Sequence, residues 1–79
     1  MINYREHISI NPNIRFGKPC IKNTRISIAD ILAWLAAGMS YEDIITDFPE
    51  IKTEHIVASL TFAANREQAI KSVISYNSI

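Results

Sequence analysis

Residues 27–49 read SIADILAWLAAGMSYEDIITDFP, and this stretch decides the fold. Apolar residues recur at three- and four-residue intervals on both sides of Gly38, which is the spacing of helices with one buried face. Ser27 is a suitable N-cap for the first helix, and Gly38 lies where a helix ends in a left-handed residue. Ser40, with Asp43 three residues later, resembles a capping box that starts a second helix. The stretch therefore predicts two short helices, the second of which ends at the proline.

A third helical period follows that proline. Thr53 is its predicted N-cap, and Glu54 is favourably placed in the first turn. The residues predicted to form its inner face are Ile56, Leu60, Ala63 and Ala64. The same period continues at Ile70, Val73 and Ile74, so the sequence predicts one long helix that extends beyond residue 66.

Three helices over residues 29–66, with short connections, are typical of a helix-turn-helix core. Its turn would span residues 48–52, and the helix over residues 54–66 would take the recognition position. Residues 67–79 would then be a helical extension and tail. Together with the segment that precedes them, these helices predict one mainly α domain over residues 1–79.

Residues 8–28 alternate in short apolar pairs separated by turn residues. This pattern predicts a small β-arm rather than a helix. The simplest arrangement is a β-hairpin across Lys22–Arg25, in which Asn23 takes the left-handed conformation. Strands this short need another element or another chain to pack against.

The composition is that of a small globular domain. The chain has 79 residues, of which 48% are hydrophobic and 20% charged, so a disordered tail is excluded. A domain of this size is marginally stable alone. The single cysteine, Cys20, rules out an internal disulfide, and with His7 and His55 it cannot form a zinc site at any usual spacing. We therefore expect a homodimer or a partner protein to add stability.

The formal net charge of zero hides a separation along the chain. Residues 1–29 hold five basic residues against one acidic residue, whereas residues 30–79 hold three basic against seven acidic residues. The basic arm would meet phosphates or an acidic protein face, unless the charges are ordinary solvated surface.

Neither a membrane segment nor a catalytic constellation is evident. The longest apolar run, Ile31–Ala37, is too short to cross a bilayer, and the N-terminus lacks an apolar signal core. The sequence thus predicts a cytoplasmic protein without membrane contact. His7 and His55 lie in unrelated elements, and Cys20 lies beside apolar residues, as small core cysteines do. We expect no enzyme activity, no cofactor and no metal.

DNA binding is one candidate function. Thr53, His55, Ser59 and Phe62 are predicted to face outward on the third helix. Glu50 and Glu54, near its start, would repel phosphates. Affinity would therefore depend on the arm and on a dimer that doubles its phosphate contacts. The candidate DNA-binding residues are Arg15, Lys18, Lys22, Arg25, Lys52, Thr53, His55 and Ser59.

Protein binding is the other candidate function. Trp34 lies to the side of the first helix's inner face, where it would either meet a partner or pack under the N-terminal strands. The apolar C-terminal residues, which include Ile79, would be a partner or dimer surface. The candidate partner-binding residues are Trp34, Arg66, Ile70, Lys71, Val73, Ile74 and Tyr76.

The segment from Gly17 to Ile26, GKPCIKNTRI, resembles the signature of a family of small bacterial proteins, domain of unknown function 433. The similarity continues through the segments Ala37–Ser40, Glu42–Asp43, Asp47–Pro49 and Ile56–Ala64, and covers about residues 8–66. Two positions depart from the usual pattern. Phe16 stands where glycine is common, and Asn23 replaces the glycine before Thr-Arg.

The resemblance implies a homeodomain-like helix-turn-helix fold. It also implies a role as antitoxin in a type II toxin–antitoxin module, where the chain would bind a PIN-like ribonuclease toxin and its own promoter DNA. Thr24 and Arg25 match the signature either as structural residues or as functional ones. The alternatives are a stand-alone DNA-binding regulator and a protein-binding adaptor.

Overall fold

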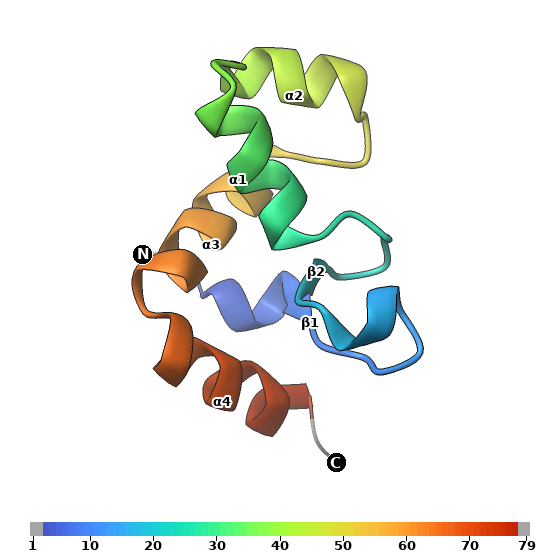
Figure 1. The fold of residues 1–79 in the computed structure, drawn as a ribbon, viewed down its shortest axis with the longest axis vertical. Helices are drawn as coiled ribbons and strands as arrows, with labels where there is room; N and C mark the ends of the chain where they lie inside the picture. Colours follow the sequence, from blue (N-terminus) through green and yellow to red (C-terminus); the bar gives the residue numbers. More distant parts are fainter. Residues whose placement is uncertain (1–2, 78–79) are drawn as a thin grey trace.

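The computed structural model describes residues 3–77 and contains, within them, four α-helices and a small sheet (Figure 1). In chain order the elements are η1 (Tyr4–Glu6, a 3₁₀ helix), β1 (Ile8–Ser9), η2 (Arg15–Gly17, a 3₁₀ helix), β2 (Cys20–Ile21), α1 (Ile28–Ala36), α2 (Tyr41–Asp47), α3 (Thr53–Ala64) and α4 (Arg66–Asn77). Helices α1 and α2 form one end of the molecule and α4 the other, and η1 contacts both α3 and α4. The predicted mainly helical fold is confirmed.

Both helices of the deciding stretch begin with a capping box. The Ser27 hydroxyl accepts from the Asp30 backbone N–H (3.0 Å), and an Asp30 carboxylate oxygen accepts from the Ser27 N–H (3.1 Å). Ser40 and Asp43 repeat the arrangement at the start of α2, with both distances 3.0 Å. Each box satisfies two backbone donors that the helix itself leaves free. The predicted starts of α1 and α2 are therefore confirmed.

Helix α3 begins one residue earlier than predicted and buries a different face. Its N-cap is Lys52 rather than Thr53, and His55 Nδ1 accepts from the Lys52 N–H at 2.9 Å. The buried residues of α3 are Ile56, Ala58, Ser59 and Phe62. Leu60, predicted to face inward, is 40% exposed. The reason is the N-terminal segment: Tyr4 packs edge-on against Phe62, with 6.2 Å between ring centroids, and covers this side of α3.

The prediction of one long third helix is wrong, because the helix is interrupted at Asn65. There the backbone leaves the helical region (φ −125°, ψ 38°), and α4 starts at the next residue. The break directs α4 back over η1 and β1 (Figure 1). Ala69 and Val73 are buried in that contact, and Asn77 Nδ2 donates to the Ile8 carbonyl at 3.3 Å.

The N-terminal arm is part of the core rather than a free extension. Strands β1 and β2 pair antiparallel, with Ile8 opposite Ile21, and both side chains are fully buried. The predicted tight turn after β2 is present: Asn23 has φ 66°, and the Ile21 N–H donates to the Ile26 carbonyl at 2.9 Å. The hairpin prediction was nevertheless incomplete. Besides its bridge to Ser27 across this turn, β2 pairs with β1, which precedes the η2 loop in the chain.

A continuous apolar core joins the two strands and the four α-helices. Among the described residues, no helix is long and apolar enough to cross a membrane. The buried core residues are Ile8, Ile21, Ile28, Ile31, Ile44, Ile51, Ile56, Ala58, Phe62, Ala69 and Val73. The N-terminal segment and α4 therefore complete the core that α1–α3 alone would leave open.

Candidate binding surface

The η2 loop holds the most exposed large apolar side chain among the described residues. Arg15, Phe16 and Gly17 take successive left-handed conformations, with φ of 50°, 58° and 81°. Phe16 is 99% exposed at this turn. Each non-glycine residue in this region costs roughly 1–2 kcal/mol. A glycine would adopt the conformation of Phe16 without that cost, which explains in physical terms why glycine suits this position.

Arg15 braces the loop against the helical body. Its Nη1 donates to the Arg25 carbonyl at 2.8 Å and to Asp30 Oδ2 at 3.1 Å. Partial burial tends to raise the pKa of Asp30, but the hydrogen bonds from Ser27 and Arg15 outweigh it and hold that pKa below its usual value. The Arg15 head group, a candidate for phosphate binding, is therefore engaged within the chain.

The two signature residues that follow β2 have different surroundings. The Thr24 hydroxyl donates to the Ile21 carbonyl at 2.8 Å and accepts from the Ile26 N–H at 3.0 Å, so it holds the turn together. The Arg25 side chain is exposed, and so is that of Lys18. Thr24 is thus a structural residue, whereas Lys18 and Arg25 leave their charges on the surface near η2.

A second basic surface forms where the N-terminal segment meets α4. The guanidinium of Arg5 and the ammonium of Lys22 each lie 5.6 Å from the centre of the Tyr76 ring. Tyr76 is 48% exposed. Ile74, two positions earlier and therefore on a different face of α4, is 51% exposed. The fold therefore brings a predicted DNA-binding residue, Lys22, together with a predicted partner-binding residue, Tyr76. We call this the Tyr76 surface (Arg5, Lys22 and Tyr76).

The C-terminal candidates separate into inward and outward residues. Val73 is fully buried against the core, so its predicted availability to a partner was wrong. Ile70 is half-buried and packs on the same core, whereas Arg66 and Lys71 are exposed. The docking of α4 onto β1 and η1 causes this division. Ile79 lies outside the described residues.

The start of α3 offers fewer free groups than its sequence predicts. Lys52 and Thr53 are exposed, but Ser59 is fully buried, and its hydroxyl donates to the His55 carbonyl at 2.8 Å. The predicted outward positions of Ser59 and of Phe62, which is also fully buried, were therefore wrong. His55 is half-buried, and its ring meets that of His7 edge-on, with 5.4 Å between centroids. Burial and the neighbouring His7 lower the pKa of His55.

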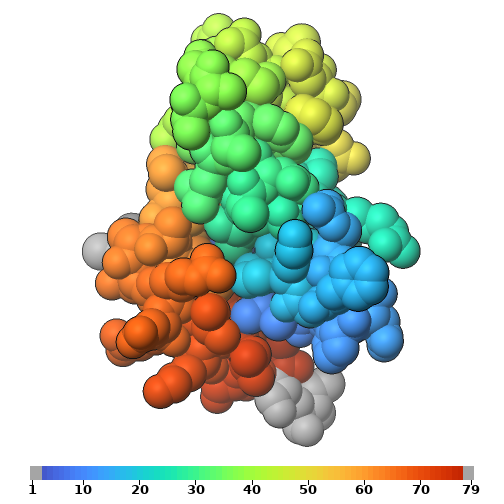
Figure 2. Space-filling view, in the orientation of Figure 1, coloured from blue at the N-terminus to red at the C-terminus, as the bar shows by residue number. Residues whose placement is uncertain are grey.

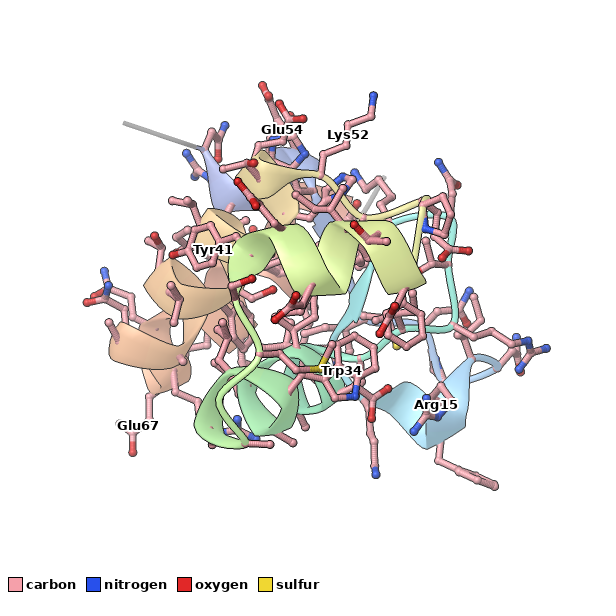
Figure 3. All side chains as sticks on the ribbon, turned by 90° about the horizontal axis from the view of Figure 1, so that it is seen from above. Arg15, Trp34, Tyr41, Lys52, Glu54 and Glu67 are labelled. Carbon is pink, nitrogen blue, oxygen red and sulfur yellow. The ribbon has the colours of Figure 1, made fainter. Side chains whose placement is uncertain are left out.

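Acidic side chains are spread over α2, the turn that follows it and the first turn of α3. All of these carboxylates are exposed: Glu42, Asp43, Asp47, Glu50 and Glu54. Figure 3 shows Lys52 and Glu54 projecting from the same edge of the molecule, away from Arg15. Figure 2 shows the N-terminal residues gathered over a different part of the surface from α2. The charge separation in the sequence is therefore also a separation in space.

Trp34 makes a contact that neither of its predicted alternatives included. Its ring stacks on that of Phe48, the C-cap of α2, with centroids 4.1 Å apart and planes within 9°. The half-buried ring thus joins α1 to α2 instead of lying beneath the N-terminal strands. This leaves the Tyr76 surface and the η2 loop as the stronger candidates for partner binding.

The surroundings of Cys20 are those of a core residue. Cys20 is buried, its Sγ donates to the Lys18 carbonyl at 3.3 Å, and burial raises the pKa of the thiol. A thiol of this kind is a weak nucleophile. Residues 3–77 contain neither a pocket nor a group of three side chains suited to hold a metal ion.

Comparisons with known proteins identify the class. The family model described as "Protein of unknown function (DUF433)" matches residues 8–63, and the chain belongs to this family. A crystal structure of a DUF433 member from Anabaena variabilis superposes with a TM-score of 0.70, at 25% identity over 85% of this chain and 67% of that chain. The uncharacterized protein y4eO of Sinorhizobium fredii is 36% identical over 62 residues, which cover 77% of this chain and 28% of that relative.

Proposed function

We propose that the chain is the antitoxin of a type II toxin–antitoxin pair and neutralises a PIN-like ribonuclease in the cytoplasm by binding it. The observation that carries the proposal is the Tyr76 surface, where two cations meet an exposed aromatic ring. Aromatic residues and arginine are enriched at protein interfaces, and charge-assisted hydrogen bonds to carboxylates are strong.

Neutralisation would act by occlusion. The resemblance implies a toxin whose acidic active site needs access for a metal ion and RNA. Lys22, Arg25 and the exposed cations of α4, Arg66 and Lys71, are suited to pair with such carboxylates. A basic surface placed over the active site would exclude both the metal ion and the substrate.

Protein binding fits the surface better than reading of duplex DNA by α3. Three exposed carboxylates, Asp47, Glu50 and Glu54, lie in or next to the turn that would approach the phosphates, and these like charges would weaken binding. Ser59 on α3 is buried and cannot reach a base edge. Apart from Lys52, the basic residues lie on the N-terminal segment and α4.

The decisive experiment is growth of cells that express the adjacent small gene, with and without this chain, followed by co-purification. Growth arrest relieved by this chain, together with a stable complex, is the expected result. If the adjacent gene does not arrest growth and no complex is recovered, the antitoxin role is contradicted.

Paired substitutions then locate the interface. Lys22→Ala combined with Arg25→Ala should weaken the complex by 10-fold or more (about 1.4 kcal/mol), because both substitutions remove surface cations. The backbone carbonyl of Arg25, which accepts from Arg15, is retained. Lys52→Ala, on the acidic edge, is the matched control and should leave the affinity unchanged. If the double variant binds the toxin as tightly as the wild-type chain does, these two residues do not belong to the interface.

A DNA-binding regulator, alone or as part of autoregulation, is the second candidate. The α2–turn–α3 arrangement with Lys52 and Thr53 exposed at the start of α3 favours it. A homodimer would double its phosphate contacts. Binding to the upstream DNA of its own gene that weakens steeply with salt would support this function. Absence of such binding would leave a protein-binding adaptor or antitoxin.

A further inference from the structure

The η2 loop presents Phe16 in a way that folding of the free chain does not explain. The side chain is 99% exposed, so its apolar surface gains nothing from the core. Its backbone lies in the left-handed region, which disfavours phenylalanine. Strained residues of this kind persist where the surrounding structure holds them, and they cluster at binding sites.

The loop is held in place before any partner arrives. Arg15 ties it to the Arg25 carbonyl and to Asp30, at 2.8 and 3.1 Å. Within the loop the Gly17 N–H donates to the Ile14 carbonyl, and the Lys18 N–H to the Arg15 carbonyl, both at 3.1 Å. A braced loop loses little conformational entropy on binding, which favours affinity.

Charge indicates the partner's chemistry. Exposed Lys18 and Arg25 lie on the segments that the Arg15 brace joins, and no exposed carboxylate lies between residues 11 and 26. A partner that receives Phe16 would therefore carry carboxylates around the contact. A second copy of this chain is acidic over α2, but its described residues offer no pocket for a phenyl ring.

We propose that Phe16 is the anchor of the toxin interface and inserts into an apolar pocket rimmed by carboxylates on that protein. The inference rests on the proposed antitoxin function and adds a contact separate from the Tyr76 surface. Central aromatic anchors carry a large share of interface energy, whereas the surrounding charges set the rate and the specificity of association.

The test measures both the thermal stability and the toxin affinity of Phe16→Gly, with two further variants for comparison. Phe16→Gly relieves the left-handed strain, so the free chain's Tm should rise by about 4–8 °C. The same change should weaken binding to the co-purified toxin by roughly 30-fold. Phe16→Asn tolerates the left-handed conformation with less flexibility and should weaken binding equally. Tyr41→Ala, which removes a partly exposed aromatic ring from α2, is the control and should leave the affinity unchanged.

The possible outcomes are separable. Tight binding by the wild-type chain with equally tight binding by both Phe16 variants would overturn the anchor and leave the antitoxin function intact. No binding by the wild-type chain would overturn both. Altered sedimentation of the free chain on Phe16→Gly would assign the ring to self-association. Loss of oligonucleotide binding with an unchanged toxin affinity would assign it to base stacking. Either of these last results would overturn the inference.

Discussion

Asp30 connects the helical body to the N-terminal loop. Its carboxylate accepts from the Ser27 N–H as half of the α1 capping box, and from Arg15, which in turn holds the Arg25 carbonyl. One side chain thus fixes both the start of a helix and the loop that carries Phe16. A lowered pKa means that the carboxylate is bound more strongly in its charged form, so its contribution is present at neutral pH and is lost as the pH falls through that pKa.

His55 gives the fold a second contribution that is lost as the pH falls, here because its neutral form is the one the fold favours. Its Nδ1 must be unprotonated to accept from the Lys52 N–H, and its pKa lies below the usual value of 6.5. As the pH falls below about 6.5, the unfolded chain takes up a proton before the folded chain does. We therefore expect the free energy of unfolding to decrease between pH 7.5 and the folded-state pKa, measured by urea denaturation.

The matched variant for this prediction is His55→Gln. Glutamine at the third helical position can accept from the N-cap N–H but does not titrate. Its stability should change less between pH 7.5 and 5.5 than that of the wild-type chain. Identical pH profiles for the two proteins would show that His55 is not the titrating group.

At the scale of elements, the sequence predicts those features that are determined by residues close together in the chain. The caps and apolar spacing of residues 27–49 act within a few residues, and both helices start where predicted. The buried face of α3 depends on Tyr4, which is 58 positions before Phe62 in the chain and therefore invisible to helical periodicity. The residues of the Tyr76 surface were individually noticeable as charged or aromatic. Their meeting depends on the break at Asn65.

The docking of α4 can be tested with neighbouring residues. Val73 is fully buried and Ile74 is 51% exposed, although both are apolar. Val73→Ala should lower the free energy of unfolding by about 1–2 kcal/mol, from lost burial and the cavity left behind. Ile74→Ala should cost less than about 0.5 kcal/mol. Equal losses in chemical denaturation would contradict a docked α4 and favour a helix that extends into solvent.

For the whole molecule, the arrangement of charge matters more than its sum. A formal net charge of zero predicts little steering, yet the N-terminal segment is basic and the α2–α3 turn is acidic. An acidic partner approaching such a molecule is attracted at one side and repelled at the other. This polarity would orient the chain before contact, with the η2 loop and the Tyr76 surface leading.

The last prediction concerns the rate of association with the proposed partner, an acidic toxin. Because steering acts through exposed charges, the association rate constant should fall several-fold between about 50 and 200 mM salt, while dissociation changes less. Lys18→Gln with Arg25→Gln should lower the low-salt rate and flatten its salt dependence. Asp47→Asn with Glu50→Gln, on the acidic side, should leave that rate unchanged or raise it. Stopped-flow mixing measures the wild-type chain and both double variants. Equal salt slopes for all three proteins, whose net charges are 0, −2 and +2, would contradict steering by these surface charges.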